Sequence, residues 1–286
     1  MLAGGGCPLV TARRPPRTAP PPGLVVAIEG VSGAGKTTVS RRWAETYRAV
    51  WIPEAWDRMR PRPSLSFRTL PRLERLEMSL LLEDARRFRE ARAAAANGST
   101  VVLDTDFVGT LSYVWGLACA VDPKWNVLPA LAATAREMHQ RGAWGLADRY
   151  YYLDVTPEAA VRRAKGARSR HPVDWASRHA AVGAAERAFW LGSRIPEFSD
   201  RVVRVDANSS VERVVAAISR AATKTPQPSS VPDPFALLTW FEWRCLPPRD
   251  TAAAPGRTSA AEARDRRPPR QGLIVKNRAP PRRGPR

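Results

Sequence analysis

The segment that most constrains the fold is an apolar run, residues 24–30, that leads directly into Gly30-Val31-Ser32-Gly33-Ala34-Gly35-Lys36-Thr37. The second part fits the pattern G-x-x-x-x-G-K-[ST] in full, and the residues after it have helical periodicity. The glycines let the backbone fold so that successive N–H groups point inward, and the N-terminus of the next helix adds a positive partial charge. The sequence therefore predicts a phosphate-binding loop (P-loop) between a buried strand and a helix.

This loop predicts a site for ATP and Mg²⁺. We expect Lys36 to reach the β- and γ-phosphates and the hydroxyl of Thr37 to ligate Mg²⁺. The residues expected to line the nucleotide are Gly30, Val31, Ser32, Gly33, Ala34, Gly35, Lys36, Thr37 and Thr38.

Short apolar segments alternate with helical patterns along the chain. The predicted strands are 24–30, 49–53, 99–104, 148–155 and 201–207. Strands that are apolar on both faces and separated by helices indicate a parallel sheet covered on both sides. The fold class we predict is α/β, a P-loop fold with a five-stranded parallel sheet flanked by helices.

The two ends of the chain differ from its centre in composition. Residues 1–23 hold three arginines and no acidic residue, and residues 222–286 hold 13 basic and 5 acidic residues, so these flanks carry more than half of the net charge of +19. They also contain 18 of the 27 prolines, and such segments bury too little apolar surface to fold. We therefore expect one domain, 24–221, with disordered flanks, and this distribution of charge argues against nucleic acid as a partner. The apolar segment 235–246 either packs on the domain or binds a partner as a short helix.

Two further classes of protein are disfavoured. No run reaches the roughly 18–20 apolar residues that span a bilayer, so we expect no membrane segment. The cysteines Cys7, Cys119 and Cys245 are odd in number and far apart, which predicts neither a disulfide framework nor a zinc site and makes a reducing cytoplasm the default location. A homodimer is left open.

The P-loop region resembles the thymidylate kinase and deoxynucleoside kinase families. IEGVSGAGKTT is similar to their opening, in which the first strand ends in Glu-Gly, and Ile52-Pro53-Glu54 followed by Trp56 is similar to the end of their second strand. LLLEDARRFRE resembles their long substrate-side helix, and YYLDVTPEAAVRRAKGARSR resembles their fourth strand, the next helix and an arginine-bearing lid. The resemblance spans about residues 24–221. It implies a nucleoside/nucleotide kinase type of fold with an Arg-rich lid, and as partners a nucleotide and a small-molecule acceptor.

This resemblance suggests roles for residues outside the loop. Glu54 is the candidate general base for an acceptor hydroxyl, the alternative being an exposed loop residue. Arg163, Arg168 and Arg170 are the candidate lid arginines that stabilise the transferring phosphoryl group, the alternative being a solvated basic helix end.

The chain departs from these families at the end of the third strand. The families usually carry Asp-Arg or Glu-Arg there, whereas this chain has Asp104-Thr105-Asp106. Asp104 is a candidate catalytic residue, and Asp104 and Asp106 are candidate Mg²⁺-binding acids, although Asp106 could instead cap the next helix. The main hypothesis is an ATP-dependent kinase for a nucleoside, a nucleotide or another hydroxyl compound. The alternatives are a P-loop ATPase or switch, which the missing arginine favours, and a nucleic-acid-associated protein.

Overall fold

The structure is a computed structural model that describes residues 23–63, 67–166, 175–224 and 233–244. All of these residues belong to one compact unit, Met1–Pro247. No helix within these ranges is both long and apolar enough to cross a membrane.

The centre of the unit is a parallel sheet. Its strands in the described part of the chain are β1 (Val25–Glu29), β2 (Val50–Ile52), β3 (Val101–Asp104), β4 (Arg149–Asp154) and β5 (Val202–Asp206). They lie in the order β2-β3-β1-β4-β5, and every neighbouring pair is parallel. This confirms the predicted five-stranded parallel sheet, and it brings the carboxyl ends of all strands, with the loops that follow them, to one edge.

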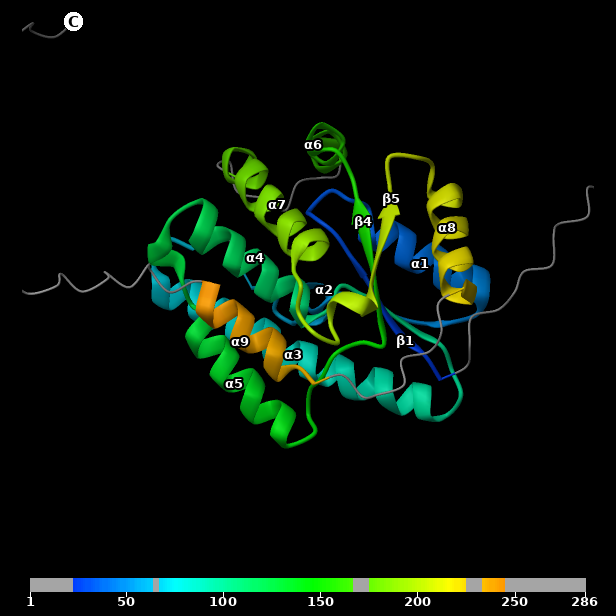
Figure 1. Cartoon of the computed structure of the whole chain (residues 1–286), viewed down its shortest axis with the longest axis horizontal. Helices are drawn as coiled ribbons and strands as arrows, with labels where there is room; N and C mark the ends of the chain where they lie inside the picture. The colour runs from blue at the N-terminus through cyan, green and yellow to red at the C-terminus, as the bar shows by residue number, and fades with distance from the viewer. Residues whose placement is uncertain (1–22, 64–66, 167–174, 225–232, 245–286) are drawn as a thin grey trace, which may run out of the picture. The chain divides into compact units, whose positions relative to one another are not determined.

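Helices cover both faces of the sheet (Figure 1). Their bounds are α1 (Lys36–Tyr47), α2 (Ala55–Arg58), α3 (Leu70–Ala96), α4 (Phe107–Ala120), α5 (Leu128–Gln140), α6 (Pro157–Gly166), α7 (Trp175–Gly192), α8 (Val211–Lys224) and α9 (Phe235–Arg244). A 3₁₀ turn, Pro123–Trp125, connects α4 to α5, and another, Ser199–Arg201, precedes β5. Helices α4 and α5 are separate because the 3₁₀ turn that begins at Pro123, with Asp122 as its N-cap, lies between them.

Alternate residues of each strand point to different cores. Tyr151 and Leu153 of β4 pack in the core beneath α1 and α8, whereas Tyr150 and Tyr152 pack in the larger core with α3, α4, α5 and α7. All six residues of β4 are buried, which is the reason for its nearly continuous apolar and aromatic sequence.

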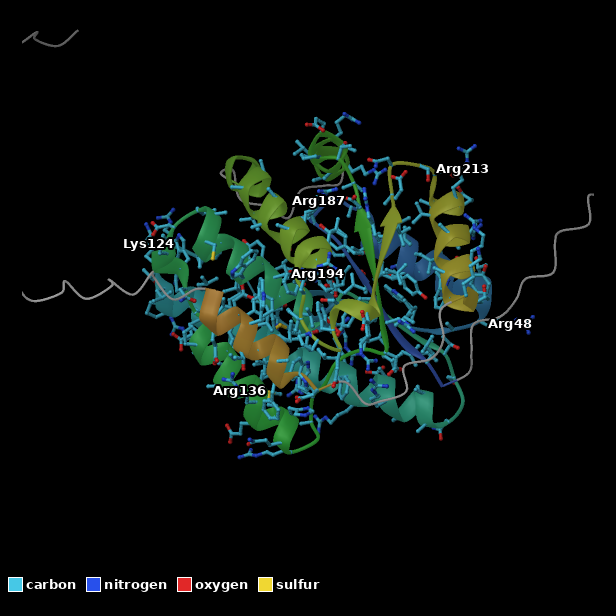
Figure 2. The ribbon with its side chains drawn as sticks, in the orientation of Figure 1. Arg48, Lys124, Arg136, Arg187, Arg194 and Arg213 are labelled. Atoms are coloured by element: carbon cyan, nitrogen blue, oxygen red, sulfur yellow. The ribbon has the colours of Figure 1, made fainter. Side chains whose placement is uncertain are left out.

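Helix α9 adds the apolar C-terminal segment to the larger core. Leu237, Leu238 and Phe241 are completely buried, and the Phe241 ring lies 4.7 Å from that of Phe189 on α7. Arg136 on α5 (labelled in Figure 2) pairs with Glu242 on α9, with Nη2 donating to Oε2 at 2.7 Å. The segment therefore packs as an integral helix of this unit.

Candidate active site

The P-loop wraps tightly at the carboxyl end of β1. Gly30, Gly33 and Gly35 have φ values of 148°, 85° and 95°, a backbone region that favours glycine. A Cβ on Gly33 would lie 2.3 Å from the carbonyl oxygen of Ala160, so only glycine fits there. Lys36 Nζ donates to the carbonyl oxygen of Gly30 at 2.7 Å. Its ammonium group thus lies within the loop, where it can turn to a phosphate group.

Asp104 ends β3 beside the first turn of α1. Its side chain is fully buried, and neither carboxylate oxygen has a hydrogen-bond partner among the described residues. Burial, and after it the charge of Glu54, raises the pKa of Asp104 to about 6, and the Thr37 hydroxyl, Lys36 and Arg87 oppose this shift. A buried acid with two unused acceptors next to the Thr37 hydroxyl fits a Mg²⁺ ion. The described residues contain no group of three acidic, His or Cys side chains that could hold a metal alone. Such an ion would thus need phosphate and water oxygens as further ligands.

Asp106 has a different environment. Its Oδ1 accepts from the backbone N–H of Val108 at 2.8 Å, so it caps α4, which is the alternative that the sequence left open. Glu29, buried at the end of β1, accepts from the Asp106 N–H at 2.7 Å and from Thr105 Oγ1 at 2.8 Å. Burial, and then the charge of Asp106, raises the pKa of Glu29 well above its usual value. Of the two acids, Asp104 is thus the one that the structure brings to Thr37.

Arg87 on α3 holds the end of β3 from the other side. Its side chain is 1% exposed and pairs with Asp84 one turn earlier. Its Nη2 donates to the carbonyl oxygens of Asp104 at 3.0 Å and Thr105 at 2.8 Å. Thr105 has a φ of 58°, which is unfavourable for a β-branched residue, so these contacts hold a strained residue. The position where the families carry an arginine therefore has an arginine beside it, supplied by a helix.

Glu54 lies between β2 and α2 and is partly buried. Its charge contributes to the raised pKa values of Asp104 and Asp84. Burial raises the pKa of Asp84 to about 7, with Arg87 opposing and Asp106 and Glu54 adding to the shift. Glu77, two turns before Asp84 on the same face of α3, is 3% exposed, and burial followed by the charge of Asp84 raises its pKa to about 8. A line of carboxyl groups thus runs from the end of β3 along α3.

Helix α7 brings another carboxyl group close to the P-loop. Burial raises the pKa of Glu186 to about 7, and Lys36 and the Ser112 hydroxyl lower it. Ser112 on α4 also accepts from Trp190 Nε1 at 3.2 Å, which ties α4 to α7 one turn after Glu186. Glu186 is therefore placed where α4, α7 and the P-loop meet.

Only one of the three predicted lid arginines can be placed. Arg163 on α6 donates to the carbonyl oxygens of Ala34 at 3.2 Å and Ala207 at 2.9 Å, so it bridges the P-loop and the loop after β5. Arg168 and Arg170 lie outside the described residues.

A cavity of about 360 Å³ lies near α6, between α7 and the strands β4 and β5. Its polar lining includes Asp154, which accepts from Arg187 Nε (Arg187 is labelled in Figure 2) at 2.8 Å and from Arg204 Nε at 2.8 Å. The two arginines lower the pKa of Asp154, Arg187 more strongly.

The structure brings together Lys36, Thr37, Asp104 and Glu54, the predicted residues on three neighbouring strand ends. Sequence reasoning missed Glu77, Asp84, Arg87 and Glu186. The signal for the α3 residues was available, because positions 77, 84 and 87 fall on the face that carries Leu73, Leu76 and Leu81. Polar residues on a buried helix face are expected to have a function or a partner.

Comparisons with known proteins show the family and the fold. The family described as "AAA domain" matches residues 25–190. A thymidylate kinase of Verminephrobacter eiseniae (strain EF01-2) is 30% identical over 208 residues, which cover 68% of this chain and 88% of that protein. Among solved structures, the deoxyadenosine kinase of M. mycoides with bound dATP is 16% identical, with a TM-score of 0.56 over 70% of this chain and 100% of that chain. The same enzyme with dCMP and dCDP bound gives a TM-score of 0.53 at 16% identity, over 70% and 99% of the two chains.

Proposed function

The chain belongs to the AAA-domain family and, with the thymidylate kinases, to the P-loop nucleoside and nucleotide kinases, and from this premise we propose that it transfers the γ-phosphate of ATP, bound with Mg²⁺, to a hydroxyl group of a small acceptor. The observation that carries the proposal is the meeting of three strand ends. The P-loop follows β1, Glu54 follows β2, and Asp104, with two unpartnered carboxylate oxygens, ends β3. Donor and acceptor groups can thus meet at one edge of the sheet.

The P-loop binds the donor. Backbone N–H groups of residues 30–38 and the Lys36 ammonium would bind the phosphates, and Thr37 and Asp104 would hold Mg²⁺. The ion, when bound, neutralises charge that develops on the phosphate oxygens. The Lys36 ammonium, which donates to the Gly30 carbonyl oxygen at 2.7 Å, would donate to a phosphate oxygen instead.

Glu54 acts on the acceptor. Its carboxylate orients the hydroxyl group and takes its proton while the hydroxyl oxygen bonds to the γ-phosphorus. The bond from that phosphorus to the bridging oxygen breaks, and the electron pair leaves with ADP. Arg163, together with Arg168 and Arg170, would supply positive charge around the transferring group.

The test is ADP release from Mg·ATP, with detection of the phosphorylated product, across nucleosides, nucleotides and hydroxylated amines. Glu54→Gln should lower kcat by about 10²-fold or more, since a positioned base contributes about 10²–10⁴-fold. The KM for ATP should stay nearly unchanged, because Glu54 follows β2, whereas the residues proposed to bind the donor follow β1 and end β3. Glu45→Gln, on the exposed face of α1, is the matched control and should keep full activity. Equal rates in the two variants would refute the role of Glu54.

The alternative is a P-loop ATPase or switch without a metabolite acceptor. The observation that favours it is Thr105, whose hydroxyl bonds to Glu29 where the related families have an arginine. ADP release that proceeds at the same rate with and without every acceptor would support this alternative.

A further inference from the structure

The cavity between α6, α7 and the ends of β4 and β5 takes no part in the proposed phosphoryl transfer. Its volume of about 360 Å³ falls within the range of about 300–1,000 Å³ that small-molecule sites usually have. Val31 of the P-loop lines the cavity, whereas Lys36, Thr37, Glu54 and Asp104 do not. The cavity therefore adjoins the P-loop but is separate from the side chains that are proposed to act on donor and acceptor.

Small residues of α7 leave this space open. Ala180, Gly183 and Ala184 line the cavity together with Arg187, and their spacing places all four on one face of the helix. A Cβ atom on Gly183 would lie 3.4 Å from Cγ1 of Val31, so α7 approaches the P-loop closely at the edge of the cavity. The wall that α7 provides thus consists of short side chains, and the space beside it can take a compact apolar group.

The charged part of the lining is a cluster of two arginines around one acid. Asp154 Oδ1 accepts from Arg187 Nε at 2.8 Å, and Oδ2 accepts from Arg187 Nη2 at 3.1 Å and from Arg204 Nε at 2.8 Å. The carboxylate stays charged because the two arginines, Arg187 more strongly, lower the pKa of Asp154. Of the described residues that line the cavity, these three are the charged ones, so the lining has a net charge of +1.

The two guanidinium groups keep donors for a ligand. Each has five N–H groups, and within the described part of the chain Asp154 is the only acceptor that either of them contacts. The side chains of Arg187 and Arg204 are 49% and 62% exposed, against 8% for Asp154, so their outer N–H groups are accessible. Helix α6 begins at Pro157, which also lines the cavity, so the positive end of its dipole lies there. All of these features favour an anion.

We propose that this cavity is a second ligand site, which binds a small molecule that joins a compact apolar body to an anionic group, a carboxylate or a phosphate. The anionic group accepts hydrogen bonds from Arg187 and Arg204, whose planar guanidinium groups match both kinds of anion. The apolar body packs against Val31 and the small residues of α7. The bound molecule contacts the P-loop through Val31 and leaves the donor site open. This inference goes beyond the proposed kinase function and does not depend on it.

The experiment measures binding to the full chain with four compounds of similar size and different charge. They are benzoate, phenyl phosphate, benzyl alcohol and benzylamine, and ligand-observed NMR titrations give their dissociation constants. At least one of the two anions should bind about tenfold or more tightly than benzyl alcohol, because hydrogen bonds between charged groups are the strong ones, and benzylamine should bind no better than the alcohol. The tighter of the two anions shows whether the site prefers a carboxylate or a phosphate.

A charge variant ties binding to the cluster. Arg187→Gln removes donors but leaves Asp154 paired with Arg204, and it should raise the dissociation constant of the tighter anion about tenfold or more. Arg194→Gln is the control, because Arg194 is exposed after the end of α7 and does not line the cavity (labelled in Figure 2). Its dissociation constant should equal that of the wild type.

A second variant fills the cavity and does not touch the ion pairs. Ala184→Leu adds a larger side chain to the wall of the cavity and should also weaken binding of the anion. Ala188→Leu is the control, because Ala188 is exposed on the same helix and is not part of the lining. A melting temperature equal to that of the wild type shows that each variant is folded, and either pair of variants is sufficient for the test.

The last measurement separates the cavity from the donor site. Saturation with adenylyl imidodiphosphate and Mg²⁺, which fills the site proposed for ATP, should leave the anion bound. Displacement of the anion by this analogue overturns the inference, because the anion is then bound where the donor phosphates bind. Failure of both anions to bind, equal constants for the anions and benzyl alcohol, or unchanged binding in Arg187→Gln and Ala184→Leu also overturns it. None of these readouts depends on turnover, so the kinase function is tested separately.

Discussion

Replacing Arg87 with methionine tests whether the end of β3 is held by α3. Methionine has a similar length but cannot donate, so the change leaves Asp84 without its ion-pair partner and removes donors from the carbonyl oxygens of Asp104 and Thr105. Loss of one member of a buried pair costs about 3–5 kcal/mol. For a domain of this size we expect the melting temperature to fall by about 2–4 °C per kcal/mol, roughly 6–20 °C in total.

The neighbouring residue offers a matched control. Arg86 also pairs with an acid three residues earlier, Glu83, but its side chain is 69% exposed. Arg86→Met should therefore cost at most about 1 kcal/mol, as exposed pairs usually do. Both free energies of unfolding are measured by urea denaturation followed by circular dichroism.

A second substitution tests whether the loss of stability in Arg87→Met comes from the unpaired Asp84. Adding Asp84→Asn to Arg87→Met removes the unpaired charge and should restore at least about 1 kcal/mol. The loss in Arg87→Met should also be larger at pH 8 than at pH 6, because a carboxyl group without its arginine takes up a proton more readily. If Arg87→Met and Arg86→Met unfold at the same urea concentration, the proposed role of Arg87 is wrong.

Three further predictions concern other parts of the unit. Lys36→Ala should abolish phosphoryl transfer while keeping the wild-type circular dichroism spectrum, because among the described residues Nζ donates hydrogen bonds only to loop carbonyl oxygens; full turnover would refute the P-loop assignment. Phe241→Ala should cost about 3–5 kcal/mol in urea unfolding, since its ring is completely buried against α7, and a loss below 1 kcal/mol would contradict the packing of α9. The pKa of Glu77 is raised to about 8, so the folded state holds its proton more tightly; stability should fall between about pH 5 and 8, and Glu77→Gln should flatten this slope in a melting-temperature series.

The sheet could be read from the sequence because each strand carries a simple signal. Residues 25–28 and 101–103 are uninterrupted apolar runs, and a strand buried on both faces requires such a run. The P-loop could be predicted equally well, because its glycines adopt positive φ values that other residues rarely adopt. These are local signals, and both were confirmed.

The rest of the site depends on contacts between residues distant in sequence. Arg87 meets the carbonyl oxygens of residues 104 and 105, and Glu29 meets residues 105 and 106 across about 77 positions of chain. No periodicity marks such pairs. The segment 235–246 was ambiguous for a related reason: an apolar helix after a proline-rich stretch has the same pattern whether it covers its own domain or a partner.

The end of β3 shows how the chain can dispense with an arginine at position 105. Glu29 holds this turn from β1 through the Thr105 hydroxyl and the Asp106 N–H, and Arg87 holds it from α3 through two carbonyl oxygens. A left-handed threonine costs energy, and it persists only where its surroundings fix it more than once, as they do here. These contacts also hold the backbone of Asp104, to whose carbonyl oxygen Arg87 donates. Both carboxylate oxygens of Asp104 have no hydrogen-bond partner among the described residues. An acid whose backbone is already fixed loses less conformational entropy when it binds a ligand, which supports the proposal that Asp104 binds Mg²⁺.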